Sequence, residues 1–355
     1  MWVLPLPMCY EGYMTRRHRT MAPDLFVDPF GERSVMAARR DLQLLGARFR
    51  FESNSRPLLR LVDAAFAGLP RHRLSAIVPH LSVKLVLRSG RLPQPRRRLE
   101  PPPLDMLSGT GLLAGATDRS DFVVLSPRER SALVVLSATM MRYPYHARYE
   151  LIEFAVFTLA ARAQQLVSLH AACVGRGGRG LLLMGPSGAG KSTLALLALL
   201  QGFDFISEDS VFVAPDTLLA TGVANFLHVR ADSLPWVERT RDVAAIRASP
   251  VIRRRSGVRK FEVDLRQGAY RLAASPLKIG AIVFLSAQKA GGGPLLRPLA
   301  KSSMGIRMTE EQAYAANQPQ WPEFRKRVSR LDAFELRRGA HPLEAVDVLR
   351  SLVER

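Results

Sequence analysis

The stretch Gly185-Pro186-Ser187-Gly188-Ala189-Gly190-Lys191-Ser192-Thr193 decides how the rest of this 355-residue sequence is interpreted. The apolar residues 180–184 before it predict a short buried strand, and residues 194–201 after it predict a helix that Gly202 ends. Glycines between a strand and a helix let backbone N–H groups point at a polyphosphate, and the helix adds its positive N-terminal end. We therefore predict that residues 185–193 bind a nucleotide, with Lys191 at the β- and γ-phosphates and the Ser192 hydroxyl on Mg²⁺. The alternative is that the glycines form only a tight turn.

The sequence is strongly basic, with 51 Lys and Arg against 31 Asp and Glu and a formal net charge of +20. Such a charge indicates an anionic partner, either a nucleic acid or an acidic protein or peptide. Seven of the cations are Lys and the other 44 are Arg, and they occur in small scattered clusters without interleaved aromatic residues. We therefore favour a small protein or peptide partner of acidic character over nucleic acid. Homo-oligomerisation is left open.

Cysteine content and hydropathy bear on the compartment. Cys9 and Cys173 are the two cysteines, too few for a disulfide framework or a cysteine-based metal site. No apolar run is long enough to span a bilayer, and at the N-terminus an apolar stretch precedes a basic one, the reverse of a secretory signal. We expect a cytoplasmic protein that does not enter a membrane.

The first half of the chain predicts a small α/β domain. Alternating apolar residues predict strands at 47–51, 81–87 and 121–125, and Asn54 or Ser55 can cap a helix at 56–69. Other predicted features are a helix that starts at Ser126-Pro127-Arg128-Glu129, a helix at 147–165, and a proline- and arginine-rich surface loop at 92–104. We divide the chain into a weakly patterned segment at 1–45, a small α/β domain at 46–150 and a P-loop domain at 151–355.

Two further candidate features accompany the glycine loop. Residues 167–174 and the strand before the loop predict a hairpin, which would place His170 on a strand next to the loop. Glu208 and Asp209 follow a buried strand at 203–206. Neighbouring carboxylates at the end of a buried strand are costly without a function, whereas a phosphoryl transferase needs one for Mg²⁺ and one as a base. The alternatives are a structural histidine and a solvated acidic turn.

The rest of the sequence predicts a mixed sheet with flanking helices. Strands are expected at 260–265 and 281–286, a helix start at Thr309–Gln312, and a last amphipathic helix from Pro342 to about Val353. Five cations lie within residues 253–260. One of them could neutralise charge on a transferred phosphoryl group, and the alternative is a charged loop without that role.

The region from about Ser168 to Val213 resembles the HPr kinase/phosphorylase family and its looser relatives, the HPr-kinase-like serine kinases. The matching elements are a histidine fifteen residues before the first loop glycine, residues 185–192 themselves, and the acid pair Glu208-Asp209. Glu208 stands where the family usually has Asp, and the Glu-Ile-Arg-Gly-Leu-Gly signature of true HPr kinases does not occur, with His228-Val229-Arg230 at best a remnant. The resemblance therefore points to relatives that modify peptide precursors or small carrier proteins.

This resemblance implies an α/β fold, with a P-loop kinase domain of the HPr kinase C-terminal type preceded by a smaller α/β domain. It implies ATP- and Mg²⁺-dependent phosphoryl transfer to a serine hydroxyl of a small protein or peptide. The implied roles are general base for Glu208, support of that base for His170, and metal binding for Asp209 together with Ser192. Lys191 bridges the β- and γ-phosphates.

Two other functions remain open at this point. One is a regulatory or assembly module that binds or hydrolyses nucleotide without a phospho-acceptor. The other, an ATP-driven transport or nucleic-acid motor, is less favoured because the Ser-Gly-Gly-Gln signature of ABC transporters does not occur. Use of GTP also stays open, although no Asn-Lys-x-Asp motif occurs.

Overall fold

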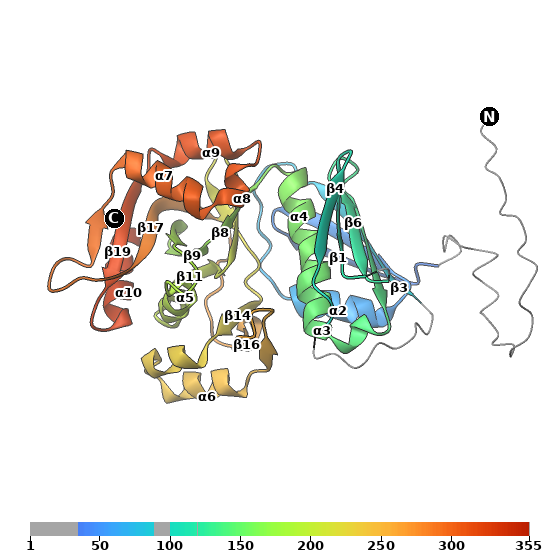
Figure 1. Cartoon of the computed structure of the whole chain (residues 1–355), viewed down its shortest axis with the longest axis horizontal. Coiled ribbons are helices and arrows are strands. Elements are labelled where there is room, and N and C mark those ends of the chain that lie inside the picture. The colour runs from blue at the N-terminus through green and yellow to red at the C-terminus, as the bar shows by residue number, and fades with distance from the viewer. Residues whose placement is uncertain (1–34, 89–99, 119, 355) are drawn as a thin grey trace, which may run out of the picture. The chain divides into compact units, whose positions relative to one another are not determined.

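The computed structural model describes residues 35–88, 100–118 and 120–354, and residues 36–355 form one compact unit (Figure 1). This unit contains a seven-stranded, a nine-stranded and a three-stranded sheet with helices packed on them. The predicted α/β class is therefore confirmed, whereas the domain limits at residues 46 and 150 remain predictions. Residues 89–99, which include most of the predicted surface loop, lie outside the described residues, as does Cys9.

The seven-stranded sheet is built from the first part of the described chain. It is mixed, because β3 pairs parallel with both β2 and β7 while the other pairs are antiparallel. Helices α2 (Arg56–Phe66) and α4 (Phe154–Ala163) pack on it and share its core. In order across the sheet, the strands are β1 (Ala38–Leu44), β2 (Ala47–Ser53), β3 (His80–Arg88), β7 (Ser131–Ser137), β6 (Phe122–Ser126), β5 (Leu112–Ala116) and β4 (Asp105–Gly109).

Two predicted helix starts are wrong. Residues 126–129 form the tight turn between β6 and β7, in which the Ser126 hydroxyl accepts a hydrogen bond from the Glu129 N–H at 3.2 Å. Cap-forming residues also suit turns, and the alternating apolar residues that follow form a strand instead of a helix. Thr309 lies in the last turn of α7 (Lys301–Glu311), so no helix starts there, and Gln312 joins the end of α7 to the start of α8 (Ala313–Ala316).

The nine-stranded sheet holds the glycine loop. Its central strand β17 pairs parallel with β10, which precedes the loop, and with β19. Strand β18 (Leu296–Pro298) extends it beyond β19 (Asp332–Arg338). The remaining order is β11 (Asp204–Ser207), β9 (Ala172–Arg176), β10 (Arg179–Met184), β17 (Leu277–Lys289), β13 (Leu219–Thr221), β12 (Ser210–Val213) and β8 (Val167–His170).

Two chain segments, 167–176 and 204–213, pair with each other twice in this sheet. The second half of the first segment forms β9, which pairs with β11, the first half of the second segment. Strand β9 also pairs with β10, as the predicted hairpin requires. The first half of the first segment forms β8, which pairs with β12, the second half of the second segment. Strand β12 also pairs with β13. The predicted strand at 167–174 is therefore broken at Ala171, and His170 lies on β8, which does not pair with β10. The break at Ala171 in the first segment lies opposite the break at Glu208-Asp209 in the second segment.

Helices cover the nine-stranded sheet. Helix α5 (Lys191–Leu200) is buried on nearly all sides because it packs against β9, β14 and helix α10 (Pro342–Val353), whose predicted ends are confirmed. Helices α7 and α9 (Trp321–Val328) share a core with Leu182 and Phe284 of β10 and β17. No helix in the described part of the chain combines the length and the hydrophobicity that crossing a bilayer requires.

A three-stranded sheet and short helices complete the unit. The sheet order is β14 (Phe226–Val229), β16 (Arg259–Asp264) and β15 (Val251–Arg253). The remaining helical elements are η1 (Met140–Arg142), α3 (Pro144–His146), the π-helical segment η2 (Ala147–Glu153), η3 (Ala231–Trp236), α6 (Thr240–Ala248), η4 (Leu265–Gln267) and α8 (Ala313–Ala316). The predicted helix at 147–165 corresponds to η2 and α4.

Candidate functional site

The glycine loop lies between β10 and α5, as the sequence predicts. Gly188 and Gly190 have φ angles of 82° and 104°, values that favour glycine, and Gly190 caps the start of α5. A Cβ atom at either glycine would meet no atom within 4 Å, so the backbone is open on this side. Within the part of the chain that the structure describes, no side chain caps α5, so the N–H groups of its first turn have no side-chain partner there. An anion at the loop would satisfy them.

Lys191 is a buried cation at the loop, with 7% of its surface exposed. Its Nζ donates to the backbone oxygens of Gly185 at 2.6 Å and Pro186 at 3.2 Å, and it forms no ion pair with a described residue. Burial lowers the pKa of Lys191, and the negative charges of Asp209 and Glu311 oppose this only in part. A desolvated ammonium without a carboxylate partner is costly, so an anionic ligand at the loop would supply the missing counter-charge.

The hydroxyls after Lys191 have different surroundings. Thr193 Oγ1 lies 2.8 Å from the Ser233 hydroxyl, which ties the start of α5 to η3. The half-buried Ser192 hydroxyl forms no hydrogen bond with another described residue and stays available as an oxygen ligand. The loop, Lys191 and Ser192 together fit a polyphosphate with an associated hard cation.

His170 and Asp209 form a pair at the two chain breaks. The Nδ1 of His170 lies 2.8 Å from Asp209 Oδ1, and the two side chains are 55% and 36% exposed. The β8–β12 register explains the contact, because His170 pairs with Ser210, the next residue after Asp209. Partial burial disfavours the charged form of Asp209, but the hydrogen bond and charge of His170, with Arg254 and Lys260, lower its pKa to about 2. Asp209 is therefore an ionised carboxylate whose negative charge acts on Lys191.

Replacing His170 by alanine should raise the pKa of Asp209 from about 2 toward the ordinary value of about 3.9. The stabilisation from a lowered carboxyl pKa is present above about pH 4 and is lost as the pH falls toward 2. His170→Ala should therefore flatten the pH dependence of unfolding in this window. Carboxyl NMR titration and urea unfolding measure the two effects, with His80→Ala as an exposed-histidine control. An unchanged Asp209 pKa would contradict the pairing.

Glu208 points to a different histidine from the one expected. Its Oε1 accepts hydrogen bonds from the His228 backbone N–H at 2.8 Å and from His228 Nδ1 at 3.0 Å. Glu208 is 5% exposed, and its Oε2 is buried without a hydrogen-bond partner among the described residues. The structure thus brings His170 to Asp209 and His228 to Glu208, so the expected support of Glu208 by His170 is not formed. The free oxygen of Glu208 is an unsatisfied acceptor.

His228 belongs to a buried chain of charged groups. It pairs with Glu262 across β14 and β16, and its Nε2 lies 3.3 Å from Glu262 Oε1. Burial alone would lower the pKa of His228, but the hydrogen bonds with Glu208 and Glu262 outweigh this and raise it. Arg148 of η2 donates to Glu262 and, at 3.1 Å, to Glu153. The chain therefore runs from Glu208 to Glu153 with alternating charge.

Arg254 is the member of the 253–260 cluster that reaches the site. Its guanidinium lies 3.2 Å from His228 Nδ1, 4.0 Å from Asp209 Oδ2 and over the Tyr149 ring, 4.7 Å from the centroid. Arg255 instead pairs with Glu150, and Arg253 pairs with Glu100. Of the five cations, Arg254 thus lies close to both His228 and Asp209, while Lys260 acts on Asp209 through its charge.

The sequence reasoning missed His228, Glu262 and Arg148 as site residues. Glu262 alternates with apolar residues in β16, and such a pattern is typical of a strand with a solvated face. This face carries a buried charge because Arg148 of η2 pairs with Glu262, a contact between distant residues that no local pattern reveals. The one available signal was a histidine inside an apolar strand, Phe226–Val229.

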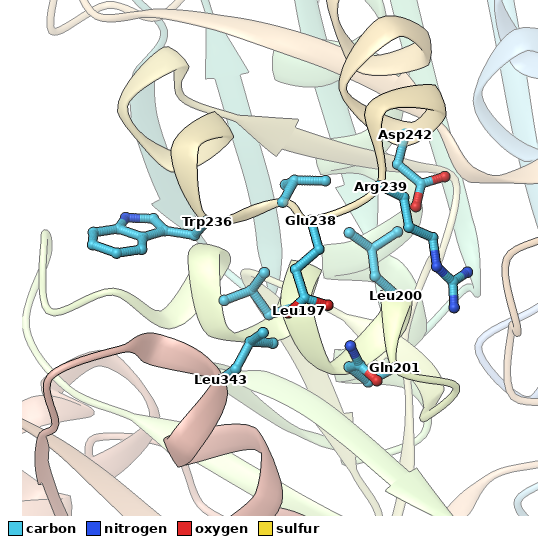
Figure 2. Close-up of a pocket in the computed structure, with 9 residues that line it drawn as sticks. Leu197, Leu200, Gln201, Trp236, Glu238, Arg239, Asp242 and Leu343 are labelled. Atoms are coloured by element: carbon cyan, nitrogen blue, oxygen red, sulfur yellow. The ribbon is translucent and has the colours of Figure 1, made fainter.

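A hollow at the far end of α5 does not belong to the site. Figure 2 shows Leu197 and Leu200 of α5 together with Trp236 and Leu343 around it. Its volume of about 10 Å³ holds at most one water molecule. It is therefore too small for a nucleotide.

The fold and the site define a mixed α/β protein with a glycine-rich loop at a helix N-terminus and an acid pair near it. No family model matches the chain, and no curated protein matches it. Among solved structures, the chain is similar to the Hpr(Ser) kinase/phosphatase from Coxiella burnetii. That match covers 52% of this chain and 94% of that chain, with 13% sequence identity and a TM-score of 0.27.

Proposed function

We propose that this protein is an ATP- and Mg²⁺-dependent kinase of the P-loop, HPr-kinase-like type that phosphorylates a serine hydroxyl of a small protein or peptide. The observation that carries the proposal is the buried Lys191 ammonium at an open glycine loop, which pairs with no carboxylate of the described residues and lies near Asp209. Bound ATP with Mg²⁺ would supply the transferable γ-phosphoryl group, with ADP as the leaving product.

Different residues bind the phosphates, hold the metal and accept the proton. Residues 185–193 and the start of α5 bind the phosphates, and Ser192 with the ionised Asp209 offers oxygen ligands to the metal. Glu208 takes the proton of the acceptor hydroxyl on Oε2, which has no partner among the described residues and which acceptor binding must uncover, because this oxygen is buried. His228 holds the other oxygen of Glu208 and so acts as a positioning residue, whereas His170 positions Asp209.

Replacing Glu208 by glutamine should leave nucleotide affinity near that of the parent and lower phosphate transfer by about 10²–10⁴-fold. The amide oxygen can still accept from His228, while the group can no longer take a proton. Rates of ³²P transfer and calorimetric titration with a nucleotide measure the two quantities. Transfer at the parental rate would refute the base assignment.

A second candidate function is a nucleotide-binding regulatory or assembly module without a phospho-acceptor. The burial of Glu208 and its double hydrogen bond with His228 favour it, because this carboxylate is held inside the protein. Mass spectrometry of proteins encoded beside this gene, co-expressed with the parent or with Lys191→Ala, separates the two functions. A mass shift of one phosphate that depends on Lys191 supports the kinase, and nucleotide binding without any shift supports the module.

A further inference from the structure

Helices α7 and α9 lie next to each other (Figure 1), and together they border a groove of about 870 Å³ on the described part of the chain. Its floor is apolar, formed by Met304, Met308 and Trp321, each at most 5% exposed. Ile306 stands at its wall with 62% of its surface exposed. A volume of this size accommodates several side chains of a bound segment.

The rim of the groove is basic. Its charged lining residues are Lys301, Arg325 and Lys326 against the single acid Glu310. Arg325 and Lys326 form no ion pair with any residue that the structure describes, whereas Arg327 on another face of α9 pairs with Glu323. Unpaired cations beside an apolar floor complement a segment that carries carboxylates and apolar side chains on one face.

Helix α7 connects the groove to the candidate site. Directly after α7, the Gln312 amide accepts from the His170 N–H at 2.8 Å and donates to the His170 carbonyl at 3.0 Å. Arg307 of α7 donates to the Leu285 carbonyl at 3.2 Å, and this oxygen lies 3.1 Å from where a Cβ of Gly185 would be. One helix therefore borders the groove and also touches both His170 and the strand end beside the glycine loop. A segment bound in the groove lies one helix diameter, ~10 Å, from the contacts with His170 and Leu285 on the other side of α7.

We propose that the α7–α9 groove docks an acidic amphipathic segment of the partner protein. That this partner is the phospho-acceptor rests on the proposed kinase function, whereas the docking itself does not. The contact would hold the acceptor serine near Glu208 by raising its effective concentration at the site.

The test uses two short fluorescein-labelled helical peptides, one of Leu, Ala and Glu and a matched one with Lys in place of Glu. Fluorescence anisotropy with the full chain should show binding of the acidic peptide only. Arg325→Glu/Lys326→Glu should weaken that binding by about tenfold or more, because two attractions become repulsions. Ile306→Ser should weaken it by about tenfold through lost apolar contact. The matched control is Arg56→Glu/Arg60→Glu, which changes two exposed cations of α2 that pair with no described acid, and it should leave the binding unchanged.

Three results would overturn the docking proposal. The first is that the basic peptide binds as tightly as the acidic one, and the second is that Arg325→Glu/Lys326→Glu binds the acidic peptide as tightly as the parent does. The third is that sedimentation shows the parent to be a dimer that Ile306→Ser dissociates, because the groove would then bind a second copy of the chain. Nucleotide affinity is measured on the same proteins and should be equal in the parent and the groove variants. A parent that binds the acidic peptide but no nucleotide would refute the kinase function and leave the docking groove standing.

Discussion

Lys191→Ala is expected to weaken nucleotide binding strongly without destabilising the folded protein. Removing one partner of a buried charged contact costs about 2–5 kcal/mol of binding free energy, or roughly 30- to 5,000-fold in affinity. The ammonium is itself desolvated, with a lowered pKa and only carbonyl partners, so its loss relieves a cost in the empty protein. Phosphate transfer should fall with the binding.

Calorimetric titration with ATP and Mg²⁺ and thermal unfolding without ligand measure the two effects. Lys84→Ala, which removes an exposed lysine of β3, is the control and should change neither. ATP binding by Lys191→Ala with parental affinity would show that the nucleotide binds elsewhere. A large loss of thermal stability would show that the ammonium serves mainly as a structural donor.

Arg148→Ala is expected to destabilise the protein by about 3–5 kcal/mol at pH 7, the cost of leaving buried charges without a partner. Arg148, Glu153 and Glu262 are 5%, 4% and 9% exposed, so water cannot replace the lost guanidinium. The control is Arg327→Ala, which breaks the Arg327–Glu323 pair, with side chains 44% and 43% exposed. Water screens an exposed pair of this kind, so its loss should change stability far less than the loss of Arg148.

The effect of Arg148→Ala should depend on pH. Burial would raise the pKa of Glu262, but His228 and Arg148 outweigh it and lower the pKa, so this residue stabilises the fold above its unfolded pKa. Burial already raises the pKa of Glu153, and loss of the arginine would raise both values. Protonation then relieves the unpaired charges, so the deficit should be largest near neutral pH and shrink toward about pH 4. Urea unfolding across this range measures it, and a deficit that grows as the pH falls would contradict the network.

The local features of the site were predictable because their signals are local. The loop between β10 and α5 follows from glycines at fixed spacing between two apolar runs, and α10 follows from Pro342 and a helical apolar period. The acid pair at the end of β11 was predictable because two carboxylates there are costly without a function. The helix predicted at Ser126 failed because the same residues suit a helix cap and a β-turn equally.

Pairings between distant residues were not predictable in the same way. His170 lies 15 positions from Gly185 in the sequence, yet its strand β8 pairs with β12 instead of β10. His228, Glu262 and Arg148 come from β14, β16 and η2, and their charges look like those of solvated positions until these elements pack together. The partner of each site carboxylate is therefore a property of the assembled sheets.

By itself, the sequence determined the strand, glycine loop and helix, the lysine at its start and the two adjacent carboxylates, since spacing and hydrophobic period act over a few residues. Only the tertiary structure decided which histidine holds which carboxylate, and that Arg148 stabilises the far end of the buried chain. The physical reason is that hydrogen bonds and desolvation depend on distances of a few ångströms between residues up to 114 positions apart, and chain packing alone sets those distances.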